Sequence, residues 1–155
     1  MSQLLINYKA LDPQNPKMAE TSNNNELLRK IIEAENSHDP ERMVALVTDD
    51  VAIEDVPINV VMRGKEGVRD GYKMFLAAAP DFRIEPKSWA VDDHTFALEF
   101  TLSGTQKGDL PGIPATNKGF SFRGCSFGEF ENGKLKSRRD YWDLMSLTTQ
   151  LGVVT

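Results

Sequence analysis

The spacing of apolar residues predicts helices in the first half of the chain. An apolar stripe at helical spacing predicts a first helix that starts near Asn25. The stripe consists of Leu27, Leu28, Ile31 and Ile32. The preceding residues 1–24 are polar and proline-containing, so we expect them to form a flexible N-terminal arm.

Two further helices are expected before residue 81. Asp39 followed by Pro40 matches an N-cap with proline at the first helical position. The buried face of this second helix is expected to carry Met43, Leu46 and Val47. Residues 63–80 predict a third helix that ends at a proline. Its apolar stripe consists of Val68, Tyr72, Phe75 and Leu76.

The period of the pattern changes from helical to alternating after residue 81, which is typical of strands. Four antiparallel strands are expected there, at 82–91, 95–105, 120–130 and 135–142. One short strand is also expected earlier, at 51–56, between the second and third helices. A terminal helix at 144–151 follows, with Asp143 as its N-cap and Gly152 as its stop. Helices gathered before a meander predict an α+β fold in which the helices cover one face of the sheet.

The Asn-Gly sequence at residues 132–133 predicts a hairpin, but two registers are compatible with it. A two-residue turn pairs Cys125 with Asp140, whereas a three-residue loop with a bulge pairs Gly124 with Asp140. We prefer the three-residue loop, because it puts Asp140 and Arg138 on the face that carries small residues. A slip of one residue would reverse that face.

A curled sheet with helices on its concave side can enclose a pocket. The strand 120–130 places Gly124, Ser126 and Gly128 on one face, between two phenylalanines. These small residues leave space that a ligand could occupy. Alternatively, the glycines relieve strand curvature or mark a bulge.

Length and composition fit one globular domain at residues 25–155, because the chain has 155 residues, 40% of them hydrophobic and 26% charged. The net charge of -5 argues against binding to nucleic acids or to anionic membrane surfaces. No segment has the length of a membrane span, and the N-terminus lacks the features of a secretory signal. A single cysteine excludes an intrachain disulfide, so we expect a cytoplasmic protein.

Several kinds of catalytic site find no support in the sequence. His38 and His94 both fall at predicted turns, and no metal-binding or catalytic-triad pattern includes them. Cys125 is expected to be a small core residue, because no basic partner can be named for it. The Gly-Pro loop at 108–119 is expected to form a lid over the pocket.

Carboxylates are the remaining candidates for chemistry. Asp140 lies inside a predicted strand, where aspartate is disfavoured. It is either a general acid/base in an apolar pocket, or a surface residue paired with Arg138 or Lys136. Glu54 and Asp55 lie on opposite faces of the first strand, so one of them is expected to point inward.

An ordered set of short motifs resembles the SnoaL-like polyketide cyclases of the nuclear transport factor 2-like superfamily. The motifs run from about residue 26 to 154. They are Pro80-Asp81-Phe82, Gly104-Thr105-Gln106-Lys107-Gly108, Gly112-Ile113-Pro114-Ala115-Thr116, Phe122-Arg123-Gly124, Glu131-Asn132-Gly133-Lys134, Tyr141-Trp142-Asp143 and Gln150-Leu151-Gly152. The resemblance implies a cone-shaped α+β barrel, also called cystatin-like, that assembles as a homodimer or homotetramer, the dimer through the convex sheet face.

The resemblance also implies an intramolecular aldol condensation without metal or cofactor, in which an aspartate on the last strand acts as acid/base. Aligning the flanking motifs places this aspartate at Asp140. Two histidines of the family are replaced, one by Ser126 and the other by Gln106. We expect Ser126 or Gln106 to hydrogen-bond the enolate oxygen instead.

The sequence therefore predicts a cofactor-independent cyclase or isomerase that acts on a small apolar carbonyl compound. The residues expected to bind this hydrophobic ligand are Phe122, Gly124, Arg138, Trp142, Phe75, Tyr72, Glu54 and Met62. Two alternatives stay open, an epoxide hydrolase-like enzyme with an aspartate–arginine–aspartate set and a non-catalytic binding or dimerisation module.

Overall fold

The computed structural model describes residues 16–153, with side chains from Thr21 onward. The elements are α1 (Pro16–Asn36), α2 (Pro40–Val44), β1 (Val47–Asp55), the 3-10 helix η1 (Val56–Ile58), β2 (Val60–Arg63), α3 (Gly64–Ala78), β3 (Arg83–Val91), β4 (Thr95–Thr105), β5 (Gly119–Glu131), β6 (Lys134–Trp142) and α4 (Leu144–Leu151). Within these residues the strands form one sheet in the order β2-β1-β6-β5-β4-β3.

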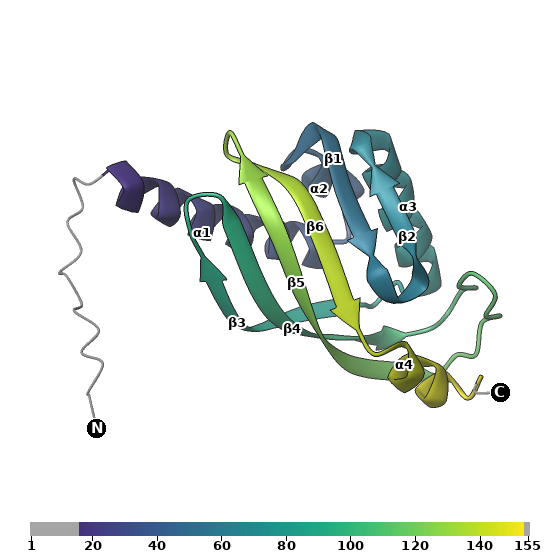
Figure 1. Cartoon of the computed structure of the whole chain (residues 1–155). Coiled ribbons are helices and arrows are strands. Elements are labelled where there is room, and N and C mark those ends of the chain that lie inside the picture. Colours follow the sequence, from purple (N-terminus) through teal and green to yellow (C-terminus); the bar gives the residue numbers. More distant parts are fainter. Residues whose placement is uncertain (1–15, 154–155) are drawn as a thin grey trace, which may run out of the picture.

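The sheet curls, and the helices α1, α2 and α3 lie on its concave side (Figure 1). The short helix α4 lies at the far end of β5 and β6 (Figure 1). Strands β3 to β6 pair in antiparallel succession, whereas β1 pairs in parallel with β6. This arrangement confirms the predicted α+β fold. None of the helices within the described residues is both long and apolar enough to cross a membrane.

Polar caps define the short helices as the sequence predicts. The carboxylate of Asp39 accepts a hydrogen bond from the backbone N–H of Glu41, and that of Asp143 accepts one from Ser146. Such caps satisfy amides that have no partner within the helix. Gly152 then ends α4 in the left-handed region with a φ of 73°. Both predicted caps are confirmed.

Other boundaries differ from the prediction. The helix α1 begins at Pro16 rather than near Asn25, because the helical backbone continues through a polar segment without an apolar stripe. The rest of the predicted N-terminal arm, residues 1–15, lies outside the described residues. Val47 begins β1 instead of lying on the second helix, and β2, which covers only residues 60–63, was not predicted.

The β5–β6 hairpin follows neither of the two predicted registers. The turn has two residues, and the strands leave it with Glu131 opposite Lys134. An extra residue, Lys136, then shifts the register, so Ser126 lies opposite Asp140. The bulge is in the strand and not in the turn. The observed register differs from that of the preferred three-residue loop by two residues. Asp140 therefore still shares the inner face with Ser126, as predicted for that loop.

Rings from β4 fill the space above the glycines of β5. A Cβ added at Gly124 would lie 2.5 Å from the ring of Phe100. A Cβ at Gly128 would lie 2.5 Å from the carbonyl oxygen of Ser137 and would also overlap the Phe96 ring. The predicted space for a ligand above these glycines is therefore wrong, since side chains of the neighbouring strand occupy it.

Substitution of Gly128 tests this packing. We expect Gly128→Ala to lower the free energy of unfolding by about 1–3 kcal/mol, because the methyl group overpacks a core position. Gly119→Ala is the matched control, since its Cβ meets only the carbonyl oxygen of Gly104 at 3.8 Å. Chemical denaturation measures both variants, and equal stability of the two would contradict the packing described.

Candidate active site

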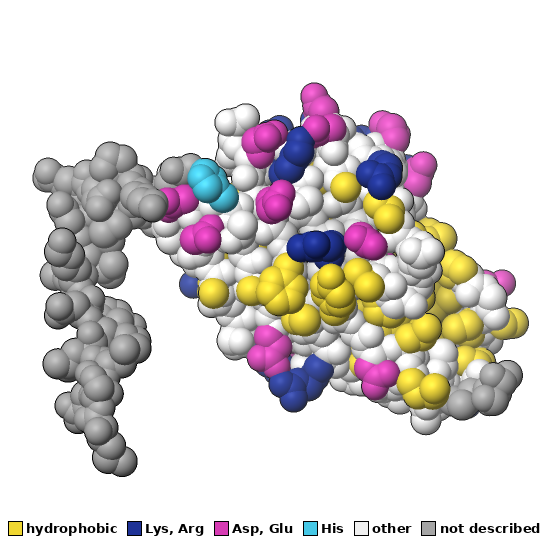
Figure 2. Space-filling model, in the orientation of Figure 1, with side chains coloured by type: hydrophobic (Ala, Val, Ile, Leu, Met, Phe, Trp, Pro, Cys, Tyr) yellow, Lys and Arg dark blue, Asp and Glu magenta, His cyan; other side chains and the backbone are white. Residues whose placement is uncertain are grey.

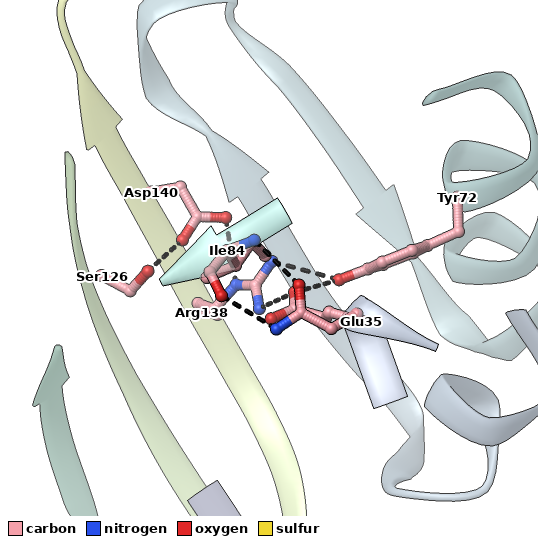
Figure 3. A network of polar contacts seen from close by, with 7 residues as sticks. Glu35, Tyr72, Ile84, Ser126, Arg138 and Asp140 are labelled. Carbon is pink, nitrogen blue, oxygen red and sulfur yellow. Dashed lines mark hydrogen bonds and ion pairs between the residues drawn. The ribbon is translucent and has the colours of Figure 1, made fainter. Parts of the chain in front are cut away.

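Arg138 joins the sheet to the helix layer in the interior of the protein. Its side chain on β6 is 12% exposed, and its Nη1 donates to Oε1 of Glu35 on α1 at 2.7 Å. Its Nε donates to Oδ2 of Asp140 at 3.0 Å. Its Nη2 lies 3.4 Å from the hydroxyl of Tyr72 on α3, which in turn donates to Glu35. Figure 3 shows these side chains converging on the guanidinium.

Asp140 is fixed by hydrogen bonds to both of its oxygens. Oδ1 accepts a hydrogen bond from the hydroxyl of Ser126 at 2.5 Å, and Oδ2 accepts from Arg138. The side chain is only 15% exposed. Lys136, the other predicted partner, pairs with Asp50 instead. Asp140 is therefore an interior carboxyl and not a surface residue.

A second carboxyl lies next to Asp140 on the inner face. In the parallel pairing of β1 with β6, Asp55 is directly opposite Asp140. Its Oδ1 accepts a hydrogen bond from Nε1 of Trp142 at 2.7 Å. The Trp142 ring stacks on Phe122 with 4.9 Å between ring centroids. Of the two candidates on the first strand, Asp55 points inward, whereas Glu54 lies opposite Arg139 on the other face.

Burial raises the affinity of both carboxyls for protons. It raises the pKa of Asp55 to about 6, and the negative charge of Asp140 adds to this rise. The Trp142 hydrogen bond and the charge of Arg138 act against it. Burial also raises the pKa of Asp140, while Arg138 and Ser126 limit the rise by stabilising the ionised form. Asp55 can therefore exchange a proton at weakly acidic pH, and Asp140 keeps its proton to a higher pH than an ordinary aspartate.

Gln106 does not take part in this site. Its amide nitrogen donates to the carbonyl oxygens of Ile113 and Pro114, and its oxygen accepts from Thr116. Gln106 directly follows Thr105, the last residue of β4, which pairs with Gly119 on β5. Gly119 is seven residues from Ser126 along the same strand, so Gln106 lies roughly 23 Å from Ser126. The predicted role of Gln106 at the reacting oxygen is wrong, because its side chain fastens the 107–118 loop.

The other predicted binding residues divide into two groups. Arg138, Tyr72, Phe122 and Trp142 belong to the polar network or to the aromatic stack beside it. Other predicted residues have packing roles. Phe75 packs on Phe82 with 4.8 Å between centroids, Met62 is half-buried against the core opposite Ile53, and Gly124 lies under Phe100. The predicted lid function of the Gly-Pro loop stays a prediction.

Glu35 belongs to the buried polar network but was not predicted from the sequence. It lies one turn after Ile31 and three residues after Ile32, on the same buried face of α1, and only 3% of its side chain is exposed. A carboxylate within an apolar helical stripe is the signal that could have found it. Charged residues are almost never fully buried unless they are paired.

A shallow cavity of about 440 Å³ lies on the outer face of the sheet. Phe127 and Arg139 line it, together with the turn that follows β3. Figure 2 shows apolar side chains gathered on this face, where Phe127 and Tyr141 are exposed. Cys125 is half-buried on the same face rather than in the core, which corrects the prediction. Among the side chains that the structure describes, no cluster of His, Cys, Asp or Glu could bind a metal ion.

The raised pKa of Asp55 has a consequence for stability. An aspartate in an unfolded chain titrates near pH 4, so between about pH 4 and 6 the folded form keeps a proton that the unfolded form has lost. Stability is therefore lost as the pH rises through this range. Asp55→Asn does not titrate, so its free energy of unfolding should rise relative to that of the wild type by about 1–2 kcal/mol from pH 4 to pH 7, with solvent screening taken into account. Chemical denaturation at both pH values measures this gain, and a difference that does not change with pH would contradict it.

Comparison with known proteins places the chain in a family. The family model described as SnoaL-like polyketide cyclase matches residues 25–151. Among solved structures, TsrD from Streptomyces laurentii is 25% identical with a TM-score of 0.76, over 86% of this chain and 97% of that chain. A protein with a ketosteroid isomerase-like fold from Catenulispora acidiphila is 18% identical with a TM-score of 0.74, over 83% and 94%. A phenazine biosynthesis-related protein from Pseudomonas aeruginosa is 17% identical with a TM-score of 0.71, over 88% and 92%.

No curated protein sequence matches this chain. The structural neighbours at 17–18% identity show the fold alone, which is the nuclear transport factor 2-like fold expected from the motifs. The family model covers most of the chain, from the apolar part of α1 to the end of α4. The chain belongs to the SnoaL-like polyketide cyclase family.

Proposed function

We propose that the protein is a cofactor-independent enzyme of the cyclase or isomerase type. It would move a proton on the carbon beside the carbonyl group of a small, mostly apolar compound. The observation that carries this proposal is the interior position of Asp140, whose two oxygens accept from Ser126 and Arg138. The family to which the chain belongs supports the general class of reaction.

The surroundings of Asp140 suit a general base. Burial raises its pKa towards the range in which a carboxyl exchanges protons efficiently. The two hydrogen bonds fix the plane of the carboxylate, so it meets a bound substrate in one orientation. The Ser126 hydroxyl donates a hydrogen bond to Asp140 and therefore orients the base, which replaces the predicted role of Ser126 at the enolate oxygen. A module that only binds a ligand needs no such buried carboxyl, so we favour an enzyme.

Exchange of hydrogen for deuterium tests this function without knowledge of the natural substrate. Enolisation of a ketone in D₂O replaces hydrogen beside the carbonyl by deuterium, which NMR detects. We expect the wild-type protein to accelerate this exchange for bicyclic ketones such as 1-indanone or 2-tetralone. Asp140→Asn should slow it by about 10²–10⁴-fold, because the variant lacks the base.

A matched control separates this effect from a general loss of structure. Glu99 is a mid-strand carboxylate that pairs with Arg123 on the outer face, so Glu99→Gln removes an exposed carboxylate–arginine pair away from the site. We expect Glu99→Gln to retain the wild-type exchange rate. Full activity of a folded Asp140→Asn variant would remove Asp140 from the mechanism.

A hydrolytic reaction is a second candidate. The observation that favours it is Arg138, which lies among several carboxyls as in the aspartate–arginine–aspartate set of epoxide-opening enzymes. In that case a carboxylate would activate water. Incubation with cyclohexene oxide in H₂¹⁸O distinguishes the two reactions. Our proposal predicts no diol above the uncatalysed background, whereas rapid formation of diol with one ¹⁸O atom would favour hydrolysis.

A further inference from the structure

Asp55 differs from the other carboxyls of the site in having an unused oxygen. Trp142 occupies Oδ1, and Oδ2 has no hydrogen-bond partner among the described residues, yet it is not a buried atom. Both oxygens of Asp140 are engaged. Glu35 accepts from Arg138 and from Tyr72 and is 3% exposed. Asp55 is therefore the carboxyl that a substrate can reach most directly.

The position of Asp55 in the sheet also favours contact with a substrate. Asp55 is the last residue of β1, and its partner Trp142 is the last residue of β6. Asp140 lies directly opposite Asp55 and precedes Trp142 by two residues, so the three side chains share the ends of these two strands. The stacking of Trp142 on Phe122 fixes the indole N–H, and through it the carboxyl group of Asp55.

The charges around Asp55 favour its protonated form. Arg138 and Ser126 hydrogen-bond Asp140 and stabilise its ionised form, whereas Asp55 accepts a hydrogen bond from Trp142 and is influenced by Arg138 through its charge alone. Two neighbouring carboxylates resist being ionised together. Burial first, and then the negative charge of Asp140, favour the protonated form of Asp55 and raise its pKa to about 6. From the helix layer, Glu35 and Tyr72 face the same interior, and both accept hydrogen bonds from Arg138.

We propose that Asp55 is a second catalytic residue, which donates a proton to the carbonyl oxygen of the substrate while Asp140 removes a proton from the adjacent carbon. This inference rests on the proposed function. As the C–H bond breaks, its proton passes to the Asp140 carboxylate and its electron pair forms the new C=C bond. The electron pair of the C=O bond moves to oxygen, which takes the proton of Asp55. The product is an enol, Asp140 is protonated and Asp55 is ionised, so charge is conserved.

The exchange of 1-indanone in D₂O, followed from pH 5 to pH 8, tests the role of Asp55. In the wild-type protein the rate should fall as the pH rises through about 6, because Asp55 then loses its proton. Asp55→Asn keeps the shape of the side chain and can still donate an N–H, but it does not titrate. We expect it to be about 10- to 100-fold slower at pH 5.5 and to lack the fall near pH 6.

Trp142→Phe provides a second test that a purely structural role would not explain. The Trp142 hydrogen bond stabilises ionised Asp55, so its removal should raise the pKa of Asp55. The fall in rate should then move to higher pH. This variant decides the question if Asp55→Asn does not fold.

The outcomes separate the two proposals. A folded Asp55→Asn variant that keeps the wild-type rate and pH profile, while Asp140→Asn loses exchange, would overturn the role of Asp55 alone. An unshifted profile in Trp142→Phe would overturn it too. Absence of any exchange with the wild-type protein would overturn the proposed function together with this inference. Glu99→Gln again serves as the control for an outer-face carboxyl.

Discussion

The buried guanidinium of Arg138 determines how the polar groups of this interior are arranged. A charge removed from water needs ionised or strongly polar partners, and breaking such a pair leaves an uncompensated charge. Those partners come from three elements, Glu35 from α1, Tyr72 from α3 and Asp140 from the same strand. The network therefore connects the helix layer to the sheet and fixes the orientation of the candidate base.

The same arrangement distributes protons unequally between two carboxyls. Asp140 has a cation and a hydroxyl donor, which stabilise its ionised form despite burial. Asp55 lies opposite it with one neutral donor, so burial and the neighbouring negative charge favour its protonated form. A base beside an acid is the combination that enolisation requires, and the assignment of roles follows from the different surroundings of two identical side chains.

The sequence predicted the fold better than the site, for identifiable reasons. Local signals such as the Asp143 cap and the alternation in β4 depend on neighbouring residues, and they were confirmed. The face of Asp140 was predicted, but its partner in β5 was not, because the bulge at Lys136 has no sequence signature. The choice of Asp55 over Glu54 depends on the parallel pairing of β1 with β6, which joins distant segments. Gln106 was assigned by family resemblance, and its bonds to the adjacent loop could not be foreseen.

The central claim is that the two interior carboxyls bind protons at unusually high pH. The most direct measurement is a pH titration of the side-chain carboxyl carbons of Asp55 and Asp140 by ¹³C NMR in the wild-type protein. The structure predicts that Asp55 titrates near pH 6 and that Asp140 titrates above the usual aspartate range of about 4. Titration of both carboxyls at or below pH 4 would contradict the account.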